Sequence, residues 1–306
     1  MPAMATVRGA LGRARRAIEA LRGAPPPAPA PAPAPAPPSR PVPRGVTLSD
    51  GRVMTEHPVA PHMIVDGHCL LVTPRILIGD YEPAVTRFLR GVVQPGDVVV
   101  DIGANQGFHT LTLGMSVVPG GHVHAFEPHP RTRRILEENL ASNGMHHTVT
   151  VVDAVAWESD GELTFRARAG EAAGSYVRDA FAIPDDRVEG EDVTVRAVDI
   201  LRFLEDLPRP PQLIKLDAEG SEERILRRAA DFLRAHHPTI VTEVLPSTFA
   251  DTAALESWER WLRDLGYEIA YLEHFGTAPV DAGSFRTLAH GVEVVLWAPG
   301  GRGALR

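Results

Sequence analysis

Apolar runs alternate with amphipathic stretches over the chain from about residue 97 onward. Short apolar runs bounded by Gly, Asp and Pro predict strands, whereas apolar positions repeated every three or four residues predict helices. We therefore expect an α/β fold with a doubly wound, mostly parallel seven-stranded sheet and helices on both faces. The expected strands are 97–102, 122–126, 149–155, 212–217, 239–244, 267–272 and 292–297, and the expected helices are about 107–116, 130–142, 221–235 and 252–265.

Two segments depart from this alternation. Residues 46–79 hold short apolar runs broken by Gly and Pro, which predict a small lead-in of strands, and residues 82–93 predict a helix. Residues 157–200 contain the runs 163–166 and 193–196, which predict short antiparallel strands around a loop rich in Gly and Asp. This insertion lies between the third and fourth expected core strands, so we expect it to shape the acceptor side of a cleft.

The N-terminal segment differs in composition from the rest. A basic stretch over residues 1–22 precedes a Pro/Ala tract over residues 24–43, which favours an extended spacer that joins no core. We expect a disordered tail here, since one short basic helix binds other surfaces weakly. The predicted organisation is a tail and linker over 1–45, a lead-in over 46–95 and the main domain over 96–300.

Composition narrows the class of protein. The net charge of -8 argues against nucleic-acid binding as the main function. No run of about eighteen apolar residues is present, so we expect no transmembrane helix. The single cysteine, Cys69, excludes an internal disulfide and fits a reducing compartment, and we expect a cytoplasmic protein.

An acid and a glycine turn follow the strand expected at 97–102. The turn contains Asp101, Gly103, Asn105 and Gly107, and the next strand ends at Glu127. The carboxyl ends of the first two strands of such a sheet form the pocket for an adenosine-containing cofactor. A carboxylate at Glu127 is placed to accept hydrogen bonds from both ribose hydroxyls.

The turn favours S-adenosylmethionine over a nicotinamide dinucleotide. A dinucleotide fingerprint needs glycines where this chain has Asn105 and Phe108, because the backbone must approach a pyrophosphate. Asp101 would repel that pyrophosphate, but it suits a cationic sulfonium or amino group. The alternative is an ordinary strand–turn–helix unit in which Asp101 caps the helix.

Charged residues also end the fourth expected strand. Lys215 and Asp217 share one face of the strand, and Asp217 leaves its carboxyl end toward the cleft. We predict Asp217 as the general base or acceptor-hydroxyl anchor. Glu219 either assists it or caps the helix that follows, and Lys215 is either a third catalytic residue or only balances the charge of these acids. Glu243 ends the fifth strand, and a divalent cation held by Glu243 and Asp217 is left open but not predicted.

Several of these segments together carry a resemblance. In their order and spacing they are similar to the FkbM-type methyltransferases that use S-adenosylmethionine, over roughly residues 76–245. The segments are Gly79–Pro83, Pro95–Gly107, Phe126–Pro130, Asn139–Asn143, Ile214–Glu222 and Pro238–Glu243.

The resemblance implies a class I methyltransferase (Rossmann-like) fold and methylation of hydroxyl oxygens on sugars or secondary metabolites. In such a fold Glu82 reaches the methionine end of the cofactor, or else it only starts a helix. Asp153 follows the third strand, where adenine is contacted, and the backbone of Ala154 serves that contact equally well.

Three functions follow from these observations. The first is O-methylation of a hydroxylated small molecule or glycan with S-adenosylmethionine as donor. The second is a nicotinamide-dependent oxidoreductase, which lacks two of its glycines here. The third is a protein that binds a cofactor or a partner without turnover.

Overall fold

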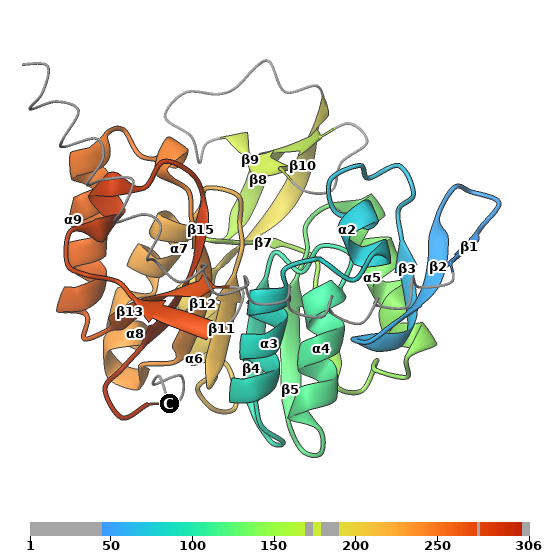
Figure 1. Ribbon diagram of the computed structural model, residues 1–306, viewed down its shortest axis with the longest axis horizontal. Coiled ribbons are helices and arrows are strands. Elements are labelled where there is room, and N and C mark those ends of the chain that lie inside the picture. The colour runs from blue at the N-terminus through green and yellow to red at the C-terminus, as the bar shows by residue number, and fades with distance from the viewer. Residues whose placement is uncertain (1–44, 169–173, 179–189, 274–275, 302–306) are drawn as a thin grey trace, which may run out of the picture. The chain divides into compact units, whose positions relative to one another are not determined.

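The computed structural model describes residues 45–168, 174–178, 190–273 and 276–301. The expected basic and Pro/Ala-rich tail lies outside these residues. Figure 1 shows a twisted central sheet with helices on both faces. The strands of this sheet are β4 (Val98–Ile102), β5 (His122–Phe126), β6 (Val149–Val152), β11 (Leu213–Leu216), β12 (Thr239–Val244), β13 (Glu268–Glu273), β14 (Gly276–Pro279) and β15 (Val292–Trp297).

The order of strands in the sheet is β14-β13-β15-β12-β11-β4-β5-β6. Strands β12, β11, β4, β5 and β6 are mutually parallel, while β15 runs antiparallel to both β12 and β13. The α/β class is confirmed, but the expected number of seven strands is wrong. Within the described residues the sheet has eight strands, because β14 pairs with β13 and extends the edge.

Alternating side chains of the central strands enter two separate cores. Val99 packs into one core and Val100 into the other, as the two-residue period of a strand requires. The first core is covered by α3 (Pro83–Val92), α4 (Phe108–Val117) and α5 (Pro130–Ser142). The second core is covered by α6 (Ile200–Glu205), α7 (Glu222–Arg228), α8 (Ala230–His236) and α9 (Thr252–Asp264).

The single helix expected over 221–235 is instead two helices, α7 and α8, which meet at Ala229. Ala229 is buried in the second core, so the break directs both helices onto the sheet. Two short 3₁₀ turns complete the C-terminal half. They are η2 (Pro246–Thr248) and η3 (Ser284–Thr287).

The lead-in forms a three-stranded antiparallel sheet, as expected from its short apolar runs. Its elements are β1 (Gly45–Thr47), β2 (Val53–His57), β3 (Ala60–Val65) and α2 (Thr73–Leu77). Met63 and Val65 of β3 are fully buried in the same core as Val99 of the central sheet. The lead-in therefore packs as part of the sheet's own hydrophobic core.

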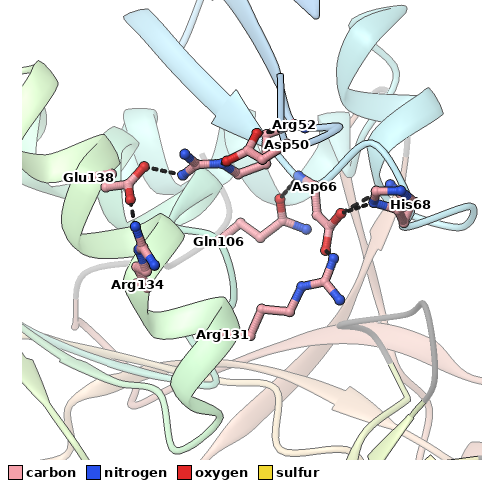
Figure 2. Close-up of polar contacts among 8 residues, drawn as sticks. All are labelled: Asp50, Arg52, Asp66, His68, Gln106, Arg131, Arg134 and Glu138. Atoms are coloured by element: carbon pink, nitrogen blue, oxygen red, sulfur yellow. Dashed lines mark hydrogen bonds and ion pairs between the residues drawn. The ribbon is translucent and has the colours of Figure 1, made fainter. Parts of the chain in front are cut away.

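Polar contacts fix the loop that follows β3 (Figure 2). The Asp66 carboxylate forms an ion pair with Arg131 of α5 at 2.7 Å, and the Asp66 N–H donates to Oε1 of Gln106 at 2.7 Å. Arg52 bridges Asp50 and Glu138 in the same region. These contacts hold the loop from Asp66 to α2 against the glycine turn after β4.

The insertion forms a second sheet of strand order β7-β10-β8-β9, and its strands β8, β9 and β10 lie near the top of Figure 1. Its strands are β7 (Val155–Trp157), β8 (Gly161–Arg168), β9 (Tyr176–Val177) and β10 (Gly190–Asp199). The expected antiparallel pairing of 163–166 with 193–196 is confirmed, because β8 pairs with β10 over this region. Phe165 and Val195 lie in a small core of its own.

Candidate cofactor and acceptor site

The turn between β4 and α4 requires glycine at two positions. Gly103 has a φ of +79°, and a Cβ atom on it would lie 1.8 Å from the carbonyl oxygen of Asp217. Gly107 has a φ of +92°, and its Cβ would lie 2.6 Å from Cδ1 of Leu136. At Gly103 the turn therefore meets the backbone of the loop after β11 at a spacing that only glycine permits, whereas Gly107 meets a side chain of α5.

Glu127 joins this turn to the end of β5. Its Oε2 accepts a hydrogen bond from the backbone N–H of Asn105 at 2.9 Å, and its Oε1 accepts one from the N–H of His129 at 2.8 Å. Burial raises the pKa of Glu127 to about 7, although these two hydrogen bonds act in the opposite direction. Asn105 has a φ of +51°, a left-handed conformation that Asn tolerates better than most residues.

A first cavity opens directly beside Glu127. It encloses about 620 Å³ with open solvent included. The turn after β4, the end of β5 and the insertion all contribute residues to its lining. Its lining includes Gly103, Asn105, Glu127, Ala154, Phe165 and Glu219.

The structure does not bring Asp153 to this cavity. The side chain of Asp153 is 63% exposed and forms an ion pair with Arg133 at 2.5 Å, whereas Ala154 is buried and lines the cavity. Of the two residues considered for an adenine contact, Ala154 therefore lines the cavity and Asp153 does not. The reason is that neighbouring residues after a strand point in opposite directions.

Asp101 lies beneath the turn, where Lys215 is its neighbour in the sheet register. Its carboxylate is fully buried; Oδ2 accepts from Oγ1 of Thr110 at 2.7 Å, and Oδ1 lies 3.8 Å from Nζ of Lys215. Within the described residues Asp101 lines neither of the two cavities of this site. Asp101 is therefore linked to the cavity lining through Lys215, which contacts Asp217.

Lys215 connects Asp101 with Asp217. Its ammonium donates to Oδ2 of Asp217 at 3.2 Å. Burial alone would lower the pKa of Lys215, but the charges of Asp217, Asp101 and Glu82 raise it above its ordinary value. Lys215 is therefore a fixed cation behind the wall that Asp217 forms.

Glu219 follows on the loop after β11 in a left-handed conformation, with a φ of +49°. Its Oε1 accepts a hydrogen bond from the N–H of Gly174 in the insertion at 2.7 Å. Burial and the neighbouring Asp217 raise the pKa of Glu219 to about 7. Glu222 fixes this loop by accepting from the N–H groups of Ala218 and Gly220, a role that sequence analysis did not anticipate.

Glu82 begins α3 with a φ of +40° and faces the same region. Its Oε2 accepts from Nε2 of the buried His109 at 2.7 Å. Burial alone would raise the pKa of Glu82, but this hydrogen bond and the charge of His109 bring it down to about 2. Glu82 is therefore ionised at neutral pH.

A second cavity adjoins the first and shares Asn105, Asp217 and Glu219 with it. It encloses about 960 Å³ with open solvent included. Its remaining acids are Glu82, Glu243 and Glu293. The structure thus brings together every predicted carboxylate of the site except Asp153 and the enclosed Asp101.

Glu293 is the site residue that sequence analysis missed. It lies on β15, directly opposite Glu243 of β12 in the antiparallel register. The only sequence signal for it is a single acid within an otherwise apolar run, Val292–Trp297. No group of three or more His, Cys, Asp or Glu side chains arranged to hold a metal ion is found in the part of the chain that the structure describes.

Comparisons with known proteins agree with the resemblance. The model of the methyltransferase FkbM domain matches residues 101–269. A protein-L-isoaspartate O-methyltransferase from Aeropyrum pernix is 41% identical over 59 residues, which are 19% of this chain and 23% of that protein. This chain thus spans about a quarter of the length of that curated relative.

Solved structures with similar folds include an FkbM methyltransferase from Methylobacillus flagellatus KT, with 18% identity, a TM-score of 0.41, and 74% of this chain and 52% of that chain covered. A precorrin-6y C5,15-methyltransferase from Geobacter metallireducens GS-15 has 19% identity, a TM-score of 0.39, and coverages of 70% and 87%. SMU.1697c from Streptococcus mutans, solved in complex with SAH, has 9% identity, a TM-score of 0.40, and coverages of 70% and 94%.

The described helices include none that is long and apolar enough to cross a membrane. The family match extends from Asp101 of β4 to the second residue of β13, and so includes the glycine turn, Glu127 and the acidic loop after β11. More than half of the chain is matched. The chain belongs to the FkbM family of methyltransferases.

Proposed function

We propose that this protein is an O-methyltransferase that uses S-adenosylmethionine to methylate a hydroxyl of a sugar, glycan or secondary metabolite. The observation that carries the proposal is the pair of adjoining cavities, which share Asn105, Asp217 and Glu219. One cavity suits a nucleoside and the other an acceptor, with carboxylates at their junction. Family membership supports the reaction type.

The first cavity fits the nucleoside half of the donor. Gly103 and Ala154 leave space at its floor, and Phe165 gives an apolar surface. Glu127 is the group we assign to the ribose hydroxyls, because a carboxylate oxygen accepts two hydrogen bonds and each Glu127 oxygen now accepts one from the backbone. S-adenosylmethionine supplies an electrophilic methyl group when bound there.

The second cavity provides the acid–base chemistry. A hydroxyl is a poor nucleophile until its proton is removed, so a base must lie near the reacting oxygen. Asp217 and Glu219 lie where the cavities meet, and we assign proton removal to this pair. The bond from sulfur to the methyl carbon breaks, the bond from oxygen to that carbon forms, and the hydroxyl proton passes to a carboxylate. Lys215 holds Asp217 in place.

Binding of S-adenosylhomocysteine, measured by calorimetry beside NADH, tests the donor assignment. We expect S-adenosylhomocysteine to bind with a Kd in the micromolar range and NADH to bind at least about a hundredfold more weakly. Glu127→Gln should weaken S-adenosylhomocysteine while leaving the fold intact by circular dichroism. A preference for NADH, or no binding of S-adenosylhomocysteine, would overturn the proposal.

Acceptor chemistry is tested separately. The purified protein is incubated with S-adenosylmethionine and a panel of sugars, amino sugars and hydroxylated metabolites, and the product is analysed by mass spectrometry. We expect the added methyl group on oxygen, and Asp217→Asn should abolish its formation without loss of S-adenosylhomocysteine binding. Methyl groups found only on nitrogen or carbon would refute the O-methylation assignment.

A further inference from the structure

The acceptor cavity has one strongly acidic wall. Glu82, Asp217, Glu219, Glu243 and Glu293 all line it. Among basic residues, Arg75 lines the same cavity. Lys215 lies behind Asp217 and forms ion pairs with both Asp217 and Asp101. Five carboxyl groups and one arginine thus line this cavity.

The pair formed by Glu243 and Glu293 is costly without a ligand. The two residues lie opposite each other on antiparallel strands, where like charges destabilise a sheet. Neither carboxylate has a hydrogen bond or ion pair within the described ranges of the chain. Burial and the neighbouring carboxylates raise the pKa of Glu243 to about 8 and that of Glu293 well above its ordinary value. A cation between them would relieve this repulsion.

Part of the lining of this cavity is apolar. Leu70, Leu71 and Val72 line it, and the first two are 74% and 52% exposed. They follow Asp66, whose contacts with Arg131 and Gln106 hold the start of this loop against α5 and the glycine turn (Figure 2). Exposed leucines at the mouth of a binding cavity are typical of a surface that receives apolar material.

We infer that the acceptor is an amphipathic amino alcohol, with a protonated amine between Glu243 and Glu293 and an apolar chain across Leu70 and Leu71. The inference rests on the proposed function, because it names the substrate class of the same cavity. A protonated amine is not a nucleophile, so it anchors the molecule while a nearby hydroxyl meets Asp217 and Glu219. An acidic wall at this depth repels anionic acceptors such as sugar phosphates.

Three commercial probes separate charge from chain. N-octyl-D-glucamine carries a protonated secondary amine, a polyol and an octyl chain; N-methyl-D-glucamine lacks the long chain; n-octyl β-D-glucoside lacks the charge. Each is titrated calorimetrically into the full-length protein, with and without saturating S-adenosylhomocysteine. We expect N-octyl-D-glucamine to bind at least about tenfold more tightly than either of the other two.

Variants test which residues produce each part of this preference. Glu243→Gln and Glu293→Gln should each remove most of the advantage of the amine over the glucoside. The double variant Leu70→Ser, Leu71→Ser should remove the advantage of the octyl chain and leave the amine preference. Glu268→Gln is the matched control, because Glu268 is exposed at the start of β13 and does not line the cavity. It should change neither the amine preference nor the octyl-chain preference.

Equal affinities for the amine and the glucoside, tighter binding of the glucoside, or no detectable binding of any probe would overturn the inference. A Glu293→Gln variant that unfolds is replaced by Glu293→Asp, which keeps the charge and should keep the amine preference. If S-adenosylhomocysteine fails to bind while the amine preference stands, the proposed function fails and the cation site remains. If S-adenosylhomocysteine binds and the probes do not discriminate, only the substrate class is wrong.

Discussion

A Cβ atom on Gly103 would lie 1.8 Å from the carbonyl oxygen of Asp217, so the turn after β4 and the loop after β11 touch through their backbones. Both loops contribute lining residues to both cavities. In the proposed reaction, this contact sets the separation between the donor and the acceptor, which methyl transfer requires to be close together.

Replacing Gly103 with alanine should therefore damage both stability and binding. The added methyl group meets backbone, which cannot move aside as a side chain can, and the φ of +79° disfavours alanine as well. We expect Gly103→Ala to lower the free energy of unfolding by about 3 kcal/mol. Urea denaturation measures the loss, and calorimetry with S-adenosylhomocysteine measures the effect on binding.

Gly144→Ala provides the matched control for this substitution. Gly144 also has a positive φ, +67°, but a Cβ on it would meet nothing within 4 Å. Its replacement should cost about 1 kcal/mol from backbone strain alone. Similar losses in the two variants would show that the contact with Asp217 is unimportant.

Asp153 and Glu127 should differ sharply in their effect on cofactor affinity. Asp153 is exposed and paired with Arg133, whereas Glu127 is buried and lines the cavity. We expect Asp153→Asn to change the Kd for S-adenosylhomocysteine less than about twofold, and Glu127→Gln to raise it at least about tenfold. A large effect of Asp153→Asn would return Asp153 to the adenine contact.

The rate of methyl transfer should rise with pH around neutrality. Burial and the charge of Asp217 raise the pKa of Glu219 to about 7. A carboxylic acid that is still protonated below this pH cannot accept the acceptor's proton, so the rate falls as the pH drops below about 7. The measurement is kcat/KM between pH 5.5 and 8.5, and Glu219→Gln should abolish this limb. An unchanged profile in that variant would assign proton removal to Asp217 alone.

Stability should decrease as the pH rises from about 6.5 to about 8. Burial raises the pKa of Glu127 and Glu222 to about 7 and that of Glu243 to about 8, above their unfolded values. The folded state therefore binds more protons than the unfolded state in this window. The free energy of unfolding falls as the pH rises through the pKa values of the folded state. We expect a loss on the order of 2 kcal/mol in urea denaturation.

Histidines act in the opposite direction but at lower pH. Burial lowers the pKa of His124 to about 4, below the unfolded value of about 6.5. Between these two values the unfolded state binds more protons, so stability rises with pH, and above about pH 6.5 His124 contributes little further change. The window above pH 6.5 therefore isolates the glutamates. Constant or rising stability there would contradict the burial of these acids.

Local patterns in the sequence were enough to predict most of the central fold. Each predicted core strand is present. The glycines of the turn and the carboxylate of Glu127 were also recognisable, because a tight turn and a strand end are set by nearby residues. The eighth strand was missed because β14 is short and ends in a proline.

The composition of the second cavity could not be predicted in this way. Glu293 meets Glu243 only because β15 inserts antiparallel between β12 and β13, a pairing across fifty residues that no local pattern encodes. The choice between Asp153 and Ala154 also depended on which one faces the cavity, and one residue of register reverses that outcome. The sequence by itself determined the elements and the edge of the sheet where the site lies, since both depend on short-range periodicity. Only the tertiary structure decided which acids share a cavity, because that follows from long-range strand pairing and packing.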